Sequence, residues 1–241
     1  MAIKSIWLRR IHKWVGLVIG LQFVLWAISG AAMALLDMET VAGGPPPDAP
    51  APALASDARA WPRILRHLGA APIEAVRSTT VLDRTVLEIR TAGTTRLFDA
   101  RTGEGLTIDA GTARAIAQAA HRDRAAPHAT TLLTAPAIPV REHAPPIWAV
   151  SFADRGSSTY YVSATNGALL ERRNDSWRWW DFFWMLHSMD YAGRTNFNHS
   201  LIVTVAIAMG WLAITGFWLL FRTMWRHDLA WLARRFTREK R

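Results

Sequence analysis

Two long apolar stretches, one near each end, dominate the pattern of hydrophobic and polar positions along this chain. The first covers 14–36 and the second covers 200–221. Each is long enough to cross about 30 Å of hydrocarbon as a helix that rises about 1.5 Å per residue. We therefore expect one membrane segment within 1–36 and another at 199–221. A cleavable signal peptide is the alternative for the first, although its apolar core exceeds the usual length of such peptides.

A helix followed by strands occurs twice between the two spans, after a Pro/Ala-rich linker at 37–56. The first helix is expected near 57–67 and the second at 112–121. Short segments bounded by turn residues predict three strands after each helix, at 75–82, 86–90 and 94–99, then at 131–139, 147–152 and 159–163. The turn regions LFDARTGEGL and YVSATNGALL also share aligned Ala, Gly and Leu positions. We therefore predict two related α+β modules in tandem, at 57–109 and 110–176.

The Trp-rich segment 177–198 leads directly into the second span. Read as a helix, 177–191 places four residues on one face: Trp180, Phe183, Trp184 and His187. Such a helix is typical of a membrane interface, where indole rings accumulate. His187 then lies on an apolar face and His199 at the mouth of the second span. Ionisable side chains at that depth are candidates for a functional site, although hydrogen bonding within the interface is the simpler alternative.

The formal net charge of +9 is concentrated outside the two spans. Residues 1–13 carry four basic and no acidic side chains, the tail 222–241 carries seven and two, and the segment between them has 17 of each sign. Basic flanks mark the cytoplasmic side, so we expect a bacterial inner-membrane protein with cytoplasmic termini and a periplasmic middle. The tail is expected to lie as a helix on anionic lipids, and no basic patch remains for nucleic acid.

The sequence contains no cysteine. This composition excludes disulfides, iron–sulfur clusters and thiolate zinc sites. It also excludes covalent haem attachment through a C-x-x-C-H motif.

Several motifs resemble the PepSY-associated transmembrane proteins. They are the opening LRRIHKWVGL, the run WRWWDFFWMLHSMDY, the pair Asn198-His199 and the two module turns. The resemblance covers nearly the whole chain. Larger members of that family have four or more spans and include haem-containing ferric-siderophore reductases of the bacterial inner membrane. This two-span chain is similar to a short form of such a reductase.

The resemblance implies a non-covalent haem b with histidine axial ligands. The candidates are His12, His187 and His199. His12 and His199 lie at opposite ends of the bilayer core, so they cannot share one haem within a chain. We therefore expect a homodimer, which would have four spans and would bring the same histidine of two copies together. In it, His12 pairs with its own copy, and His199 pairs with its copy or with His187, giving two haems per dimer.

Other residues are weaker candidates. Met33 is a possible axial ligand, and His227 can substitute on the cytoplasmic side but is expected to be solvated. Gly16 and Gly20 form a G-x-x-x-G pattern, and we expect the first spans of two copies to pack closely there. Each span contains a short segment of small residues, Ala27-Ile-Ser-Gly30 in the first and Ala213-Ile-Thr-Gly216 in the second. Small residues at these positions allow tight helix packing or leave room for a flat cofactor. Four histidines lie in the exported modules without ligand spacing: His67, His121, His128 and His143.

The resemblance implies a reductase that passes electrons to periplasmic ferric iron or a ferric siderophore and so supports iron uptake. Reduction loosens the chelate because hard oxygen ligands hold Fe(II) less strongly. The sequence has no nucleotide-binding fingerprint, so the electron donor is a partner, quinol or a soluble reductant and is not identified. The alternatives are a haem-free regulatory protein that binds a peptide or protease, and a cytochrome b-like subunit of another oxidoreductase.

Overall fold

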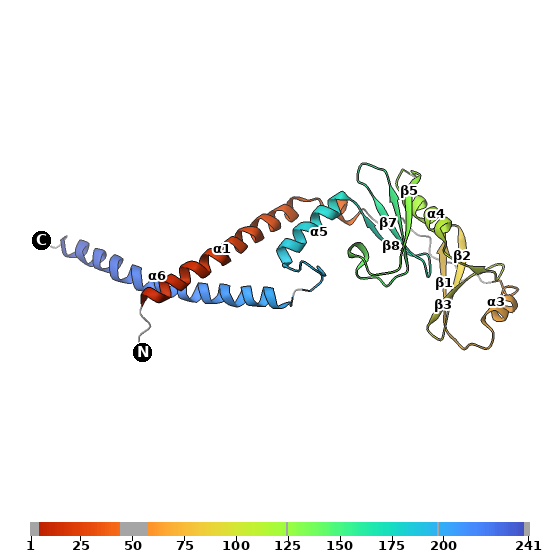
Figure 1. Cartoon of the computed structure of the whole chain (residues 1–241), viewed down its shortest axis with the longest axis horizontal. Helices are drawn as coiled ribbons and strands as arrows, with labels where there is room; N and C mark the ends of the chain where they lie inside the picture. Colours follow the sequence, from red (N-terminus) through yellow and green to blue (C-terminus); the bar gives the residue numbers. More distant parts are fainter. Residues whose placement is uncertain (1–4, 44–56, 124, 197, 239–241) are drawn as a thin grey trace. The chain divides into compact units, whose positions relative to one another are not determined.

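The computed structural model describes residues 5–43, 57–123, 125–196 and 198–238, and side chains beyond 222 are not described (Figure 1). The chain divides into two compact units. The membrane unit consists of the described residues up to Leu35 and from Phe182 onward, and the α+β unit is Leu36–Asp181.

Two long helices form most of the membrane unit. Helix α1 is Ser5–Leu35 and helix α6 is Ser200–Arg238. Within them, Ile6–Leu35 and Ser200–Arg222 are long and apolar enough to cross a membrane. Neither helix contains a proline, so nothing interrupts its backbone hydrogen bonds. For the same reason α6 continues through the tail, where we expected a separate surface helix.

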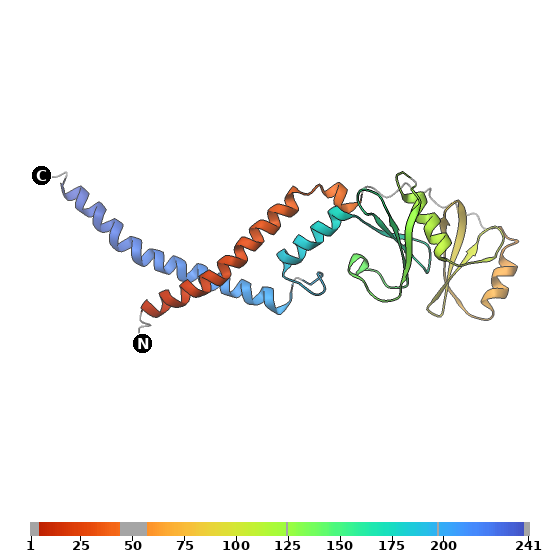
Figure 2. The same ribbon diagram turned by 45° about the horizontal axis from the view of Figure 1, so that its top comes forward.

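One face of α1 is less exposed than the rest. Its positions recur at alternating intervals of four and three residues: Leu8, His12, Val15, Ile19, Gln22, Trp26, Ser29 and Met33. This spacing is that of a heptad seam between helices. The two helices cross near Gly16, where an added Cβ would lie 3.8 Å from Leu212 Cδ2 (Figure 2). The opposite face exposes large apolar side chains such as Leu17 and Ile28, as a lipid-facing surface does.

A third helix, α5, covers Asp175–Ser188, and the boundary between the units falls within it. We expected it to extend to Tyr191. It ends earlier because Met189 has a φ of 55°, in the left-handed region that terminates a helix. Trp179 and Phe182 are exposed, which leaves the expected face of this helix as its less exposed side.

The first sheet of the α+β unit is antiparallel with strand order β1-β2-β3-β4. Its strands are β1 Ile73–Val81, β2 Arg84–Thr91, β3 Thr94–Asp99 and β4 Gly105–Leu106. Helix α3, Trp61–Leu68, precedes it. Strand β4 was not expected from the sequence, because two residues are too few to show an alternating pattern.

The second sheet repeats this plan with strand order β5-β6-β7-β8. Its strands are β5 Pro127–Leu133, β6 Ile147–Phe152, β7 Thr159–Ser163 and β8 Leu169–Arg173. Helix α4, Ala110–Ala120, precedes it. We expected the first strand at 131–139, but Pro139 lies in a short 3-10 helix, η1 Ile138–Val140, so the strand ends earlier.

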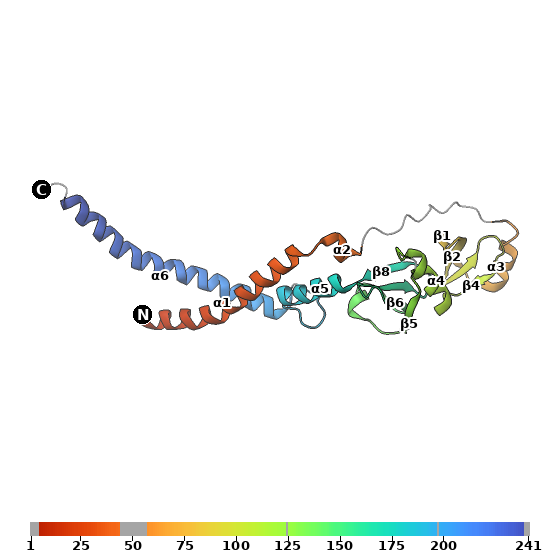
Figure 3. The ribbon, with the colours of Figure 1, turned by 90° about the horizontal axis from the view of Figure 1, so that it is seen from above.

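The two modules share a core, which the tandem interpretation did not foresee. On β2 and β3, Val86 and Leu97 belong to a cluster with Ala113 of α4 and Val150 and Val162 of the second sheet. Side chains alternate across a strand, so the intervening residues reach the opposite face. There they form a second cluster with α3: Ala60, Ile64, Leu68, Leu87, Ile89, Phe98 and Ala100. Figure 3 shows α4 beside the strands of both sheets.

The expected linker starts with a short helix. Helix α2, Met38–Ala42, is capped by the Asp37 side chain, which accepts from Thr40 N, and it ends at Gly43 with a φ of 85°. Residues 44–56, most of the expected linker, lie outside the described residues. The chain thus has the expected class of fold, an α+β region between two apolar helices in sequence.

Candidate functional sites in the membrane unit

His12 of α1, one of the three histidines predicted as haem ligands, contacts α6. His12 Nδ1 lies 2.7 Å from Thr215 Oγ1, and the His12 ring stands 6.2 Å from the ring of Trp211, centroid to centroid. A Cβ added at Gly216 would lie 3.5 Å from His12 Cε1 and 4.0 Å from Nε2. The missing side chain of Gly216 therefore gives the imidazole its place against α6. We call His12, Trp211, Thr215 and Gly216 the His12 site.

His187 of α5, the second histidine predicted as a ligand, makes the same kinds of contact with α1. His187 Nδ1 lies 3.2 Å from Ser29 Oγ, and its ring stands 6.3 Å from that of Trp26. A Cβ added at Gly30 would lie 3.4 Å from His187 Cε1. We call His187, Trp26, Ser29 and Gly30 the His187 site.

Each site uses one of the two similar segments of the spans, 27–30 in α1 and 213–216 in α6. Ser29-Gly30 of α1 receives the histidine of α5, and Thr215-Gly216 of α6 receives the histidine of α1. His12 and Ser29 are 17 positions apart on one helix, which separates the sites by about 25 Å along α1. The similarity of the two segments was visible in the sequence. The histidine that each segment contacts was not, because Thr215 is 203 positions from His12.

The third predicted histidine, His199, is held differently. Its Nε2 lies 3.0 Å from the main-chain oxygen of Ser188, and its Nδ1 accepts from Ile202 N at 3.4 Å. A carbonyl oxygen only accepts, so Nε2 carries the hydrogen. Both ring nitrogens of His199 are therefore engaged, and the ring joins the end of α5 to the start of α6.

The loop between α5 and α6 is organised by one carboxylate. Asp190 accepts hydrogen bonds from the main-chain N–H groups of Ala192, Gly193, Thr195 and Asn196. The bond from Asn196, then those from the other three residues, lower the pKa of Asp190 from 3.8 to about 2 against the opposing effect of burial. Four donors on one side chain fix the path of the chain beyond His187.

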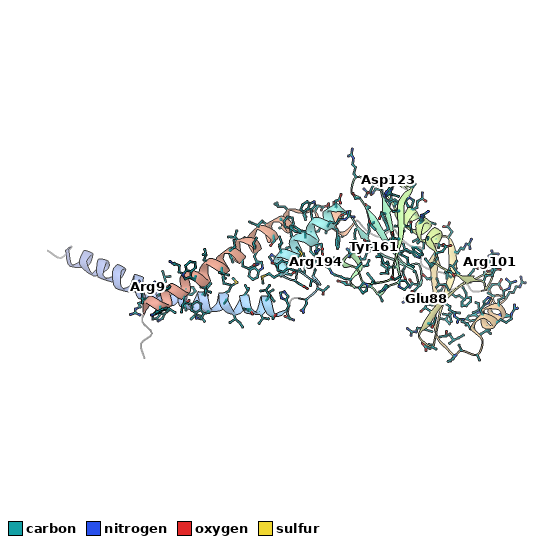
Figure 4. The ribbon with its side chains drawn as sticks, in the orientation of Figure 1. Arg9, Glu88, Arg101, Asp123, Tyr161 and Arg194 are labelled. Carbon is teal, nitrogen blue, oxygen red and sulfur yellow. The ribbon has the colours of Figure 1, made fainter. Side chains whose placement is uncertain are left out.

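A second tie comes from an indole. Trp184 Nε1 donates to the main-chain oxygen of Arg194 at 3.1 Å, and Arg194 is labelled in Figure 4. The backbone of Arg194 has a φ of 59°, a left-handed conformation that is uncommon for a residue other than glycine. The loop therefore has a defined conformation next to the His187 site.

Two buried donors lie on the seam of α1. Within the described residues, Gln22 Nε2 and Trp26 Nε1 have no hydrogen-bond partner. An unsatisfied N–H in an apolar layer is costly, and Trp26 belongs to the His187 site. An acceptor group bound at that site would satisfy the indole.

The remaining histidines have structural surroundings or lie outside the described side chains. His121 is buried, stacks on Phe152 at 4.4 Å and lies 3.2 Å from Asp154 Oδ2. His143 Nε2 lies 3.1 Å from Glu171 Oε1. The prediction for His227 falls on a side chain that is not described. No cluster of three or more His, Cys, Asp or Glu that could hold a metal ion occurs among the described residues.

The α+β unit has a hollow of its own at the strand turns of its first module. Its volume is about 840 Å³, and charged side chains of both signs line it: Asp57, Asp83, Arg84, Asp99, Arg101 and Glu104. Asp99 is already engaged, since it accepts from the main-chain N–H groups of Arg101 and Thr102. Nothing in this lining selects one ligand.

Fold and sites together define a membrane protein with two apolar helices, an α+β region between them in sequence, and one histidine at each of two matched helix contacts. The family model described as the PepSY-associated TM region matches residues 9–241. The chain therefore belongs to the PepSY-associated transmembrane family, as its motifs suggested. No match was found among curated proteins or among solved structures.

Proposed function

We propose that the chain binds haem b and works as an inner-membrane reductase, which carries electrons to periplasmic ferric iron or a ferric siderophore. One observation carries the proposal: two matched histidine sites lie about 25 Å apart along α1, a separation close to the thickness of the hydrocarbon layer. One site would lie near each membrane surface. Haem, when bound, supplies reversible one-electron redox chemistry.

The residues at both sites fit a haem. Imidazole is the usual axial ligand of haem iron, and each site offers one imidazole whose Nδ1 is engaged. Within the described residues Nε2 of His12 and of His187 makes no hydrogen bond, so each ring has a nitrogen available for iron. Gly30 and Gly216 leave room for the two rings, because an added Cβ would lie 3.4 Å from His187 Cε1 and 3.5 Å from His12 Cε1. The unpartnered indole N–H of Trp26 is a donor for a haem carboxylate.

This assignment changes the roles expected from the sequence. His12 remains a proposed ligand, and His187 becomes the proposed ligand of the other haem. His199 becomes a residue that positions the end of α5, because both its nitrogens are engaged.

The proposed functional form is a homodimer with two haems. Among the described residues each site holds one histidine with an available nitrogen, so the same histidine of a second copy would help to hold each haem. We expected Gly16 and Gly20 to mark the contact between copies. Gly16 faces Leu212 of its own chain, whereas Gly20 has no atom within 4 Å of an added Cβ. The proposed contact therefore includes the Gly20 side of α1.

The charge distribution supports the orientation. Basic residues outside both spans favour cytoplasmic termini and a periplasmic α+β unit. The site near the N-terminus, containing His12, would then receive electrons from a donor that is still to be identified. The His187 site would deliver them, and one electron converts one Fe(III) into Fe(II).

A haem-free binding protein is the second candidate, and the hollow of about 840 Å³ in the α+β unit favours it. In that case the α+β unit would hold a peptide or partner protein, and both histidines would stabilise the helix packing.

The deciding experiment measures haem in the purified full-length protein and ferric reduction in anaerobic membranes. We expect a reducible b-type spectrum with one haem per protomer by pyridine haemochrome. Membranes with the protein should reduce ferric citrate faster than membranes without it, and His128→Ala, a change at an exposed histidine, should leave both properties intact. A colourless protein produced with ample haem would refute the proposal and favour the binding protein.

A further inference from the structure

We propose that Thr215 and Ser29 are positioning residues that decide which ring nitrogen of His12 and of His187 is free to bind a ligand. Each hydroxyl accepts the Nδ1 hydrogen of the histidine at its site and leaves a lone pair on Nε2. That the ligand is haem iron rests on the proposed function, whereas the choice of nitrogen rests on geometry alone.

Each hydroxyl donates its own hydrogen to a carbonyl oxygen of its own helix. Thr215 Oγ1 lies 2.8 Å from the main-chain oxygen of Trp211, and Ser29 Oγ lies 2.7 Å from that of Leu25. Two oxygens at this distance need a hydrogen between them, and a carbonyl oxygen has none to give. The hydroxyl hydrogen therefore points to the carbonyl in both helices, an arrangement common for Ser and Thr inside helices.

The imidazole nitrogen must therefore supply the hydrogen in its contact with the hydroxyl. A hydroxyl whose hydrogen is committed can only accept from a further neighbour. His12 Nδ1 at 2.7 Å and His187 Nδ1 at 3.2 Å must then carry the hydrogen in these contacts. A neutral imidazole holds one hydrogen, so Nε2 has the lone pair in both rings. The hydrogen bond at one nitrogen selects the other as the ligand atom, as it does for metal-binding histidines in general.

The two sites place the hydroxyl and the histidine on different helices. The hydroxyl on α6 serves the histidine on α1, and the hydroxyl on α1 serves the histidine on α5. Each hydroxyl is followed by the glycine that leaves room for the ring. The repeated Ile-Ser-Gly and Ile-Thr-Gly of the spans are thus two copies of one device, a hydrogen-bond acceptor next to a gap.

The first test uses the full-length protein prepared without haem, with ¹⁵N-labelled histidine side chains, in lipid nanodiscs. Signals are assigned by their loss in His12→Ala and His187→Ala. We expect the ¹⁵N shifts of His12 to show hydrogen on Nδ1 in the unmodified protein and in Thr215→Ser. Thr215→Val has nearly the same shape but no acceptor, so we expect it to shift the hydrogen toward Nε2 while His187 stays unchanged. Ser29→Ala should have the reverse selectivity, with Ser29→Thr as its control.

Unchanged His12 shifts in Thr215→Val, or hydrogen on Nε2 in the unmodified protein, would overturn the inference whether or not the protein binds haem. The second test uses haem-loaded protein. We expect Thr215→Val to weaken haem retention at the His12 site by about 10-fold or more, with recovery in Thr215→Ser. Equal retention in the two variants would refute the link to iron. A protein that binds no haem would refute the proposed function and leave the ¹⁵N result standing.

Discussion

The His12 site and the His187 site hold the same kinds of residues but are built in different ways. His12 lies inside a 31-residue helix, and its ring meets a second long helix at the crossing point. His187 lies in the last turn of a 14-residue helix and is followed by a loop. The Nδ1-to-hydroxyl distance is also shorter at the His12 site, 2.7 Å against 3.2 Å. Helix packing positions the first ring, whereas the second depends on the loop that ends its helix.

This difference explains why so many polar contacts surround the His187 site. Asp190, His199 and Trp184 each make a contact that fixes the chain after α5. No such set surrounds His12 among the described residues, because a continuous helix already satisfies its own backbone. Changes to the loop should therefore affect one site and spare the other.

The largest expected effect is the loss of a haem, which distinguishes the proposed ligand His187 from the positioning residue His199. We expect His187→Ala to remove one of the two haems of the dimer, as His12→Ala should remove the other, because iron–histidine bonds dominate the retention of non-covalent haem. His199→Gln should keep both haems, since its amide N–H can still donate to the Ser188 carbonyl. The measurement is haem per protomer with reduced-minus-oxidised spectra. A complete loss of one haem in His199→Gln would return His199 to the ligand set.

The next effect concerns the space beside each ring. Gly30→Val and Gly216→Val place methyl groups against the imidazoles, since even a Cβ comes within 3.5 Å of a ring carbon at both positions. Overpacking of this kind costs about 1–3 kcal/mol. We expect each variant to lose haem at its own site and keep it at the other.

Gly210→Val serves as the matched control, because an added Cβ at Gly210 meets no atom within 4 Å. It should retain both haems in the same retention measurement. If all three variants lose haem equally, the effect comes from general damage to the helices and the proposed role of the two glycines is wrong.

A smaller effect tests the loop. Asp190→Ala removes the acceptor of four main-chain hydrogen bonds, and the side chain is partly exposed, so we expect a loss of about 1–2 kcal/mol in local stability. Haem dissociation should become faster at the His187 site and stay unchanged at the His12 site. Asp175→Ala, at an exposed residue of the first turn of α5, is the control. Equal acceleration at both sites would contradict the local role of the loop.

The long apolar spans, the two α+β modules and the family could be predicted from the sequence, because length, alternation and motifs are local signals. The shared core around α4 was not predictable, because it depends on contacts between modules. For the candidate sites, the sequence named His12, His187 and His199 together, but it could not show that His199 has both ring nitrogens engaged. Its engagement depends on how the loop returns to Ser188, which no periodicity reveals. Likewise, Thr215 meets His12 only after the helices cross.

The smallest expected effect is the pH response of the same loop. The pKa of Asp190 is lowered to about 2, chiefly by the Asn196 N–H and then by the other donors. A carboxylate whose pKa is depressed in the folded state stabilises the fold fully above its unfolded pKa of about 3.9. That contribution is lost as the pH falls through about 2. We therefore expect the ¹H–¹⁵N signal of Gly193, whose N–H donates to Asp190, to titrate with a midpoint near 2. The titration should disappear in Asp190→Asn, whereas a midpoint near the ordinary value of 3.8 would show that the four hydrogen bonds do not form in solution.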